Sequence, residues 1–358
     1  MRCDMRRILA CLSLFFFLVP VTYVRGPDPI PDTSQYIGLT PVAFNQKNNE
    51  QTKTGRLEFL AGWKLTSQND GFGGFSSMLI MTDNRLLLLS DNGTLAGFTL
   101  DEKNNQAVRP FIAPLPDGPP PPNEFAKKNW DSESLLHDPK TGQYWVGFEH
   151  HHSIWRFGRS FARKEAAHFP KEMQNWPDNG GAEAMLRLPD GRFLVFAESA
   201  RFSKGGFQAL IFKDDPAEKD SRPEIFGQRA PKGYQLTDAV MLDEHHASFL
   251  YRRFTPIQGV SAIVAIADTR NIQADMVLIP EPIAFLKPPL TIDNMEALAV
   301  SKDDNETIIW IASDDNFNPV QESLLLKFRL LPNKEQEKAA SQNEKTKANP
   351  GFSTLEQE

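Results

Sequence analysis

Acidic side chains recur at similar points along this sequence, each at the start of a short apolar run. The members of this set are Glu133, Glu183, Asp238 and Glu296, with Ser77 at the corresponding place in the first run. Successive members are 50 to 58 residues apart. Carboxylates that converge in space can bind a divalent cation or exchange protons with a substrate. The pattern predicts an acidic site built by several repeats, with Glu133, Glu183 and Glu296 as candidate catalytic residues.

A second polar set follows the next apolar run of each repeat. It comprises Asp91-Asn92, Glu149-His150, Glu198-Ser199, Arg252-Arg253 and Asp314-Asp315-Asn316. Ligand sets made of oxygen atoms favour Ca²⁺ or Mg²⁺ over zinc, so we expect a divalent cation, with Ca²⁺ preferred. The predicted metal ligands are Asp91, Glu149, Glu198, Asp238 and Asp314. Since arginine holds phosphate or carboxylate through paired donors, the predicted substrate-binding residues are Arg252, Arg253, His150 and Asn92.

Two other roles fit the same residues. Acids at the starts of strands can accept hydrogen bonds from backbone amides of neighbouring repeats, which would hold the repeats in register without any chemistry. The run His150-His151-His152 is also compatible with a zinc site, for which His245-His246 is the candidate partner. Alternation along a strand would place His150 and His152 on one face and His151 on the other.

The elements that must position these side chains are short strands. Each repeat contains several apolar runs separated by turns rich in Asp, Gly, Pro or Asn, with almost no helical periodicity. About four strands per unit at this period are typical of a β-propeller, whose innermost strands line a central channel. Five repeats are visible, so we predict five four-stranded blades; a sixth blade within Tyr36–Leu65 is possible. A β-sandwich with evenly spaced strands is the alternative fold.

The last repeat has too few strands to complete a blade. Its apolar runs end near Leu330, where a fourth strand is still missing. Arg56–Leu65, which precedes the first repeat, has the character of that missing strand. We therefore predict that an N-terminal strand completes the final blade and closes the ring.

Both ends of the chain differ in composition from the repeats. Residues 1–26 combine early arginines with an apolar run too short to span a bilayer comfortably, and they predict a secretory signal peptide. An uncleaved N-terminal anchor is the alternative. Residues 27–53 form an N-terminal extension, 54–332 the propeller domain, and 333–358 a polar tail expected to be disordered. We expect a bacterial periplasmic or secreted protein with no membrane span after cleavage.

Composition excludes several partners and mechanisms. The 358 residues carry 39 Lys and Arg against 46 Asp and Glu, for a net charge of -7, whereas proteins that bind duplex DNA usually carry a basic excess. Cys3 and Cys11 both precede the predicted cleavage point, so the mature chain has no thiolate for catalysis or zinc. The sequence lacks the nucleophile elbow, the H-E-x-x-H motif, the P-loop and G-x-G-x-x-G. A small anionic ester or phosphoester, not nucleic acid, is the expected partner.

Several phrases of the sequence together resemble one family. They are NGTLAGF, DSESLL, WVGFEHHHSIWRF, NGGAEAMLRLPDGRFLVFAES, and NMEALAV with IWIASDDNF. Over residues 54–330 this combination resembles the bacterial phytase-like family, also called "esterase-like activity of phytase". The resemblance implies a propeller and, by analogy with calcium-dependent propeller phytases, hydrolysis of an ester or phosphoester.

Three functions remain open at this point. The first is metal-assisted hydrolysis of a phosphoester or ester at the acidic mouth of the channel. The alternative is a non-catalytic binding propeller of the periplasm, with a glycan, peptide or protein as its ligand. The third is a carbohydrate-active enzyme that uses a pair of carboxylates.

Overall fold

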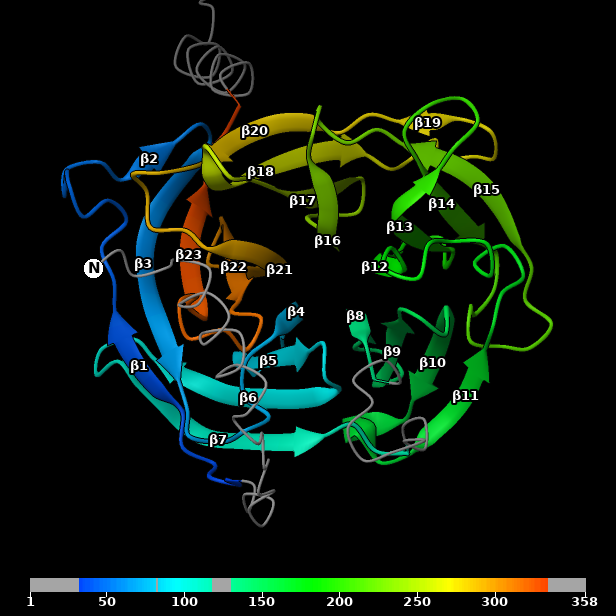
Figure 1. Cartoon of the computed structure of the whole chain (residues 1–358). Helices are drawn as coiled ribbons and strands as arrows, with labels where there is room; N and C mark the ends of the chain where they lie inside the picture. Colours follow the sequence, from blue (N-terminus) through cyan, green and yellow to red (C-terminus); the bar gives the residue numbers. More distant parts are fainter. Residues whose placement is uncertain (1–31, 82, 118–129, 334–358) are drawn as a thin grey trace, which may run out of the picture. The chain divides into compact units, whose positions relative to one another are not determined.

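Antiparallel strands account for nearly all regular structure in this computed structural model, which describes residues 32–81, 83–117 and 130–333 (Figure 1). A short 3₁₀ turn, η2 (Arg159–Phe161), is the exception among these residues. No helix within the same ranges has the length and hydrophobicity needed to cross a membrane. The predicted signal peptide and residues 334–358 of the predicted tail lie outside the described residues.

Three of the repeats form separate sheets in which consecutive strands are antiparallel neighbours. The first sheet comprises β8 (Ser132–Asp138), β9 (Gln143–Phe148), β10 (Ser153–Phe157) and β11 (Lys164–His168). The second comprises β12 (Ala182–Arg187), β13 (Phe193–Arg201), β14 (Phe207–Phe212) and β15 (Pro223–Gln228), with β19 (Val277–Leu278) added in parallel at its outer edge. The third comprises β16 (Gln235–Met241), β17 (His246–Thr255), β18 (Gly259–Asp268) and β20 (Glu281–Leu286).

The remaining sheet contains two four-stranded units that are joined at their outer edges. One unit comprises β4 (Phe75–Ile80), β5 (Arg85–Ser90), β6 (Thr94–Asp101) and β7 (Gln106–Pro114). The other comprises β21 (Asn294–Asp303), β22 (Glu306–Asp314), β23 (Leu324–Leu330) and β3 (Leu57–Thr66). Strand β3 thus completes the last unit, as the sequence predicts. The short β1 (Gly38–Pro41) pairs with both β3 and β7 and links the last unit to the first, while β2 (Lys53–Thr54) pairs with β3.

The innermost strands of these units form a closed ring. Strands β4, β8, β12, β16 and β21 contact one another in that order, and β21 also contacts β4. Figure 1 shows the sheets arranged around a common centre, with β11, β15 and β20 on the periphery. The predicted all-β propeller class is confirmed, and the β-sandwich alternative is wrong.

Apolar side chains on both faces of the strands hold neighbouring units together. Leu86–Leu89 in β5 are all buried, which explains why the strand reads as a continuous apolar run without alternation. One core cluster joins Trp63 of β3, Phe98 of β6 and Trp310 of β22, and so connects the first and last units. Burial of apolar surface stabilises a fold by roughly 25 cal/mol per Å². The ring therefore gives the ends of the inner strands a rigid frame.

Candidate functional site

A cavity of about 650 Å³ opens where the inner strands begin and the second strands end. Its walls are formed mostly by acidic side chains, with one arginine and one histidine. The lining residues are Ser76, Asp91, Asp131, Glu133, Glu149, His150, Asp178, Asn179, Glu183, Glu198, Arg252, Glu296, Asp314 and Asn316. All three predicted catalytic glutamates are among them, as are four of the five predicted metal ligands.

Each inner strand carries a β-bulge at the cavity, and the bulges determine which side chains face it. In β8, Ser132 lies opposite Phe148 and Ser134 opposite Gly147, which leaves Glu133 as the extra residue. The same irregularity occurs in β4, β12, β16 and β21. The extra residues of the five strands are Ser76, Glu133, Glu183, Thr237 and Glu296. A bulge redirects a side chain away from the ordinary alternation of a strand, so these five occupy equivalent positions. Four of them line the cavity, whereas the hydroxyl of Thr237 donates to the carbonyls of Leu250 and Met295.

This equivalence corrects the predicted ring at two positions. The sequence pattern placed Ser77 and Asp238 in the ring, but the extra residues of their strands are Ser76 and Thr237. Asp238 is buried outside the cavity, where its Oδ2 accepts hydrogen bonds from the Leu298 amide at 2.8 Å and from Ser77 Oγ at 3.2 Å. Asp238 thus ties β16 to β21 and β4, which is the structural role that the sequence left open for the acids.

We expect Asp238→Ala to lower the free energy of unfolding by about 2 kcal/mol, because it leaves the Leu298 amide and the Ser77 hydroxyl without their acceptor. Asp238→Asn keeps an acceptor and should cost less than half as much. Chemical denaturation of both variants checks this. Neither variant should change any cation-induced rise in melting temperature; a loss of that rise in Asp238→Asn would return Asp238 to the metal ligands.

The first residue of each group in the second polar set lies at the predicted position in every unit. In each unit, the residue just before the bulge pairs with a residue of the second strand, and the next residue along that second strand lines the cavity. These residues are Asp91, Glu149, Glu198, Arg252 and Asp314. The first, second, third and fifth repeats therefore present a carboxylate at this position, whereas the fourth repeat presents the guanidinium of Arg252.

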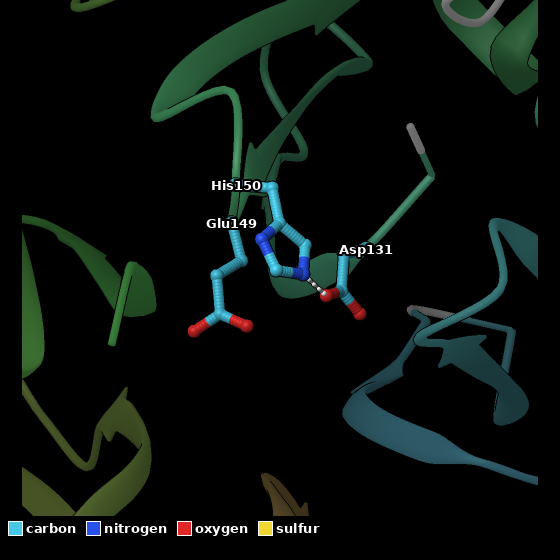
Figure 2. Close-up of side chains that lie close together, drawn as sticks. All are labelled: Asp131, Glu149 and His150. Carbon is cyan, nitrogen blue, oxygen red and sulfur yellow. Dashed lines mark ion pairs between the residues drawn. The ribbon is translucent and has the colours of Figure 1, made fainter. Parts of the chain in front are cut away.

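Three donors in the second repeat lie close enough together to hold one cation (Figure 2). One ligand atom from each of Asp131, Glu149 and His150 falls within 4.8 Å of the others. His150 Nε2 lies 3.0 Å from Asp131 Oδ2, and the Gly181 amide donates to Glu149 Oε1 at 3.0 Å. The sequence predicted Glu149 as a ligand and His150 as a substrate contact, and it missed Asp131. The available signal was the phrase DSESLL, which Asp131 opens.

Burial and mutual repulsion keep protons on these carboxyls. Desolvation, reinforced by neighbouring carboxylates, raises the pKa of Glu133 and Glu183 well above the usual range. Desolvation also raises the pKa of Glu149 to about 8. A bound cation is the usual alternative to protonation for such a cluster. The cluster therefore either takes up protons or binds a cation near neutral pH.

Arg252 is the cation of this cavity and engages two of its acids. Its Nε lies 2.5 Å from Glu296 Oε1, and one Nη lies 3.7 Å from Glu198 Oε1. Asn294 Nδ2 also donates to Glu296 Oε1 at 2.8 Å. Desolvation still raises the pKa of Glu296 to about 8, although Arg252 opposes the shift. Glu296 is thus held in place by Arg252 and Asn294.

Two predicted substrate contacts point away from the cavity. Arg253 follows Arg252 in β17 and by strand alternation faces the other side, where it stacks 4.6 Å over the ring of Tyr234. Asn92 closes a turn, with Oδ1 accepting from the Thr94 amide at 3.0 Å. Arg253 and Asn92 are each adjacent in sequence to a residue that lines the cavity, and adjacency alone does not tell which of two neighbours faces it.

The three histidines do not alternate as a strand would require. His150 and His152 both have positive φ values, 39° and 40°, so the segment is a turn. His150 lines the cavity, whereas His152 is buried and its Nε2 lies 3.1 Å from the Trp176 carbonyl oxygen. Asp178 and Asn179 also reach the cavity from the segment between β11 and β12, and no repeat pattern marks them.

The chain is similar to several solved structures at low sequence identity. The solved structures that the chain is similar to include Mala s 1, the major allergen of Malassezia sympodialis (14% identity, TM-score 0.44, covering 78% of this chain and 91% of that one). They also include an α-L-arabinofuranosidase from Clostridium thermocellum (9% identity, TM-score 0.46, 72% and 90% covered) and the β-propeller domain of Cps50 (Swd1) from Myceliophteria thermophila (8% identity, TM-score 0.38, 85% and 98% covered). Likenesses at this level carry no functional argument.

No curated protein matches the chain at a significant level. Residues 70–317 match the family described as phytase-like, with "esterase-like activity of phytase". This match covers both polar sets and every residue that lines the cavity. The chain therefore belongs to the phytase-like family.

Proposed function

We propose that this propeller hydrolyses a phosphoester or carboxylic ester with the help of a divalent cation. The observation that carries the proposal is the cluster of Asp131, Glu149 and His150 in a cavity that Arg252 also lines. Among the described residues Arg252 is the one arginine of this lining, and it belongs to the repeat two positions further around the ring. Such a cavity offers a cation site and a separate anion contact.

The donor set fits a divalent cation. Two carboxylates and an imidazole suit zinc or manganese, and further carboxylate oxygens nearby also suit Ca²⁺. Burial raises the pKa of Glu133, and the nearby charges of Asp131, Glu149 and Asp91 raise it further, so these carboxyls share one region of negative potential. A bound cation would supply Lewis acidity and lower the pKa of a bound water.

Side chains of the cavity would bind the substrate and transfer the protons. Arg252 donates hydrogen bonds to the anionic group of the substrate and is itself oriented by Glu296. Protonated Glu133 or Glu183 gives a proton to the leaving oxygen as the bond from that oxygen to phosphorus or to the acyl carbon breaks. The oxygen of the attacking water forms the new bond to phosphorus or to the acyl carbon, and a proton of that water passes to an ionised carboxylate of the cavity. Residues 1–26, as a predicted signal peptide, would place this activity in the periplasm or outside the cell.

Asp131→Asn and His150→Asn should each lower kcat/KM at least about 100-fold, because each removes a donor from the cation cluster. The assay panel comprises aryl phosphomonoesters, phosphodiesters and carboxylic esters, each with Ca²⁺, Mg²⁺, Mn²⁺ or Zn²⁺ after chelator treatment. His151→Asn is the matched control: His151 is exposed and does not line the cavity, so its turnover should equal that of the parent protein.

The proposal predicts turnover that requires a cation and is lost in both cluster variants. Turnover that persists unchanged in chelator would contradict it. Saturable cation binding without turnover of any ester in the panel would favour the binding propeller instead. Release of reducing sugar from oligosaccharides would favour the carbohydrate-active alternative.

A further inference from the structure

Three segments beside the cavity share an unusual composition, and we call them the basic rim. They are residues 199–206 at the end of β13 and after it, residues 229–235 after β15, and residues 252–259, which begin at the cavity-lining Arg252 of β17 and reach the start of β18. Together they contain six basic residues and no acidic residue: Arg201, Lys204, Arg229, Lys232, Arg252 and Arg253. The chain as a whole has a net charge of -7, so the three segments of the rim have a charge opposite in sign to that of the whole chain.

The three segments of the basic rim touch one another. A Cβ on Gly205 would lie 3.7 Å from an Nη of Arg229, which joins the first segment to the second. The guanidinium of Arg253 lies 4.6 Å from the centroid of the Tyr234 ring, which joins the second to the third. Residues scattered over 61 positions of sequence therefore form one continuous surface on two neighbouring units.

Three of the rim's six cations are available to a partner. Arg201, Arg229 and Lys232 are exposed, and none of them forms an ion pair with any carboxylate of the described ranges. Lys204 lies 3.5 Å from Asp275, and Arg252 is engaged inside the cavity. Arg201 and Arg253 stack on aromatic rings, which holds their guanidinium groups in place without neutralising them.

An apolar tip projects from the same surface. β17 continues beyond Arg252 to Thr255 and turns back into β18 through residues 256–258, with Phe254 paired to Val260 just before the turn. Phe254 is 63% exposed and Ile257 is 97% exposed. Isolated exposed apolar residues are ordinary, but an aromatic and a branched aliphatic side chain at the tip of a hairpin beside a cluster of cations is the composition of a peripheral membrane contact.

We propose that the basic rim and its hairpin tip bind the surface of a membrane that contains anionic lipids. Phe254 and Ile257 enter the interface between headgroups and acyl chains, while Arg201, Arg229 and Lys232 contact anionic headgroups. Cations near an anionic surface and apolar side chains in the interface add to each other, since neither alone gives stable binding. A soluble polyanion would satisfy the cations but would give the apolar tip no partner. The inference is independent of the proposed hydrolysis, because none of the five side chains that it assigns to the membrane lines the cavity.

The test is co-sedimentation of the purified protein with vesicles of phosphatidylcholine alone and of phosphatidylcholine mixed equally with phosphatidylglycerol. We expect binding to the mixed vesicles only, weakened by salt because the headgroup contacts are screened. The double variant Phe254→Ser/Ile257→Ser should lower the partition coefficient at least about tenfold, and Arg229→Glu/Lys232→Glu should do the same.

The segment between β22 and β23 offers a matched control. Phe317 is 41% exposed and Val320 is 83% exposed there, but residues 314–323 contain three acids and no basic residue. Phe317→Ser/Val320→Ser should therefore leave vesicle binding unchanged. Melting temperatures of all variants report whether the fold is intact.

Equal binding to neutral and mixed vesicles, or no binding to either, overturns the proposal. Equal loss in the Phe254/Ile257 and Phe317/Val320 variants also overturns it, because the contact would then depend on apolar exposure in general. Binding to heparin with no binding to vesicles assigns the rim to a soluble polyanion and overturns the lipid assignment.

Discussion

Raising the pH from about 5 to about 9 in chelator should destabilise the protein steeply, and a divalent cation should restore the lost stability. The pKa of Glu149 and that of Glu296 are each raised from 4.5 to about 8, chiefly by desolvation. A carboxyl whose pKa is higher in the folded state binds its proton more tightly there. Its contribution to stability is therefore complete below pH 4.5 and is lost as pH rises through about 8.

The expected loss is several kcal/mol over this range, since each unit of pKa shift corresponds to about 1.4 kcal/mol. Melting temperatures measured at each pH, with chelator and then with a cation series, provide the check. A cation at about 100 times its Kd adds about 2.7 kcal/mol if it binds the folded state alone. The gain from cation should grow with pH as the ligands ionise.

The double variant Asp131→Asn/Glu149→Gln should lose most of the cation-induced gain and become less sensitive to pH in chelator. Asp190→Asn is a matched control, because Asp190 lies in an exposed turn outside the cavity, paired with Arg192. A pH profile in chelator that stays flat, with no cation response, would show that the acidic cavity is neutralised in some other way.

Replacing Arg252 by Met should cost roughly 3 kcal/mol of stability near pH 9, where Glu296 is ionised, because it leaves Glu296 and Glu198 buried without their cation. Proton uptake by Glu296 limits the cost, so the deficit should shrink as pH falls. The same variant should lower kcat/KM for phosphodiesters at least about 100-fold if Arg252 holds the anionic group. Neutral carboxylic esters should lose much less.

Arg252→Lys separates charge from geometry. Lysine keeps the charge but lacks the planar paired donors of arginine, so it should recover most of the stability and only part of the phosphodiester activity. Arg270→Met removes a comparable charge at the exposed pair with Asp268 and should change neither property. Full activity of Arg252→Met on phosphodiesters would exclude Arg252 as the anion contact.

The repeat pattern alone was sufficient for the architecture. Short apolar runs separated by turns at a regular interval can bury their side chains only against neighbouring copies, which forces a ring of blades. The incomplete final repeat likewise required a strand from elsewhere, and β3 supplies it. The second polar set was also predictable, because Asp91, Glu149, Glu198, Arg252 and Asp314 end equivalent strands, and equivalent ends meet at one side of a propeller.

Tertiary structure decided which neighbours of these positions enter the cavity. One extra residue in each inner strand exchanges the two faces locally, so Ser76 and Thr237 stand where the pattern placed Ser77 and Asp238. Bulges leave no reliable mark in a single sequence, because they depend on the register between two strands. The pattern could identify acids at the right strand ends, but not the face that each one takes.

The cation cluster shows the same division between sequence and structure. Sequence placed Glu149 and His150 together at the end of β9, and it did so because they are adjacent in the chain. Asp131 joins them through the pairing of β8 with β9, and His150, whose backbone has a positive φ, places its Nε2 3.0 Å from Asp131 Oδ2. Periodicity therefore determined the ring and its acidic mouth, whereas strand register and turn geometry determined the site, because both arise from contacts between segments.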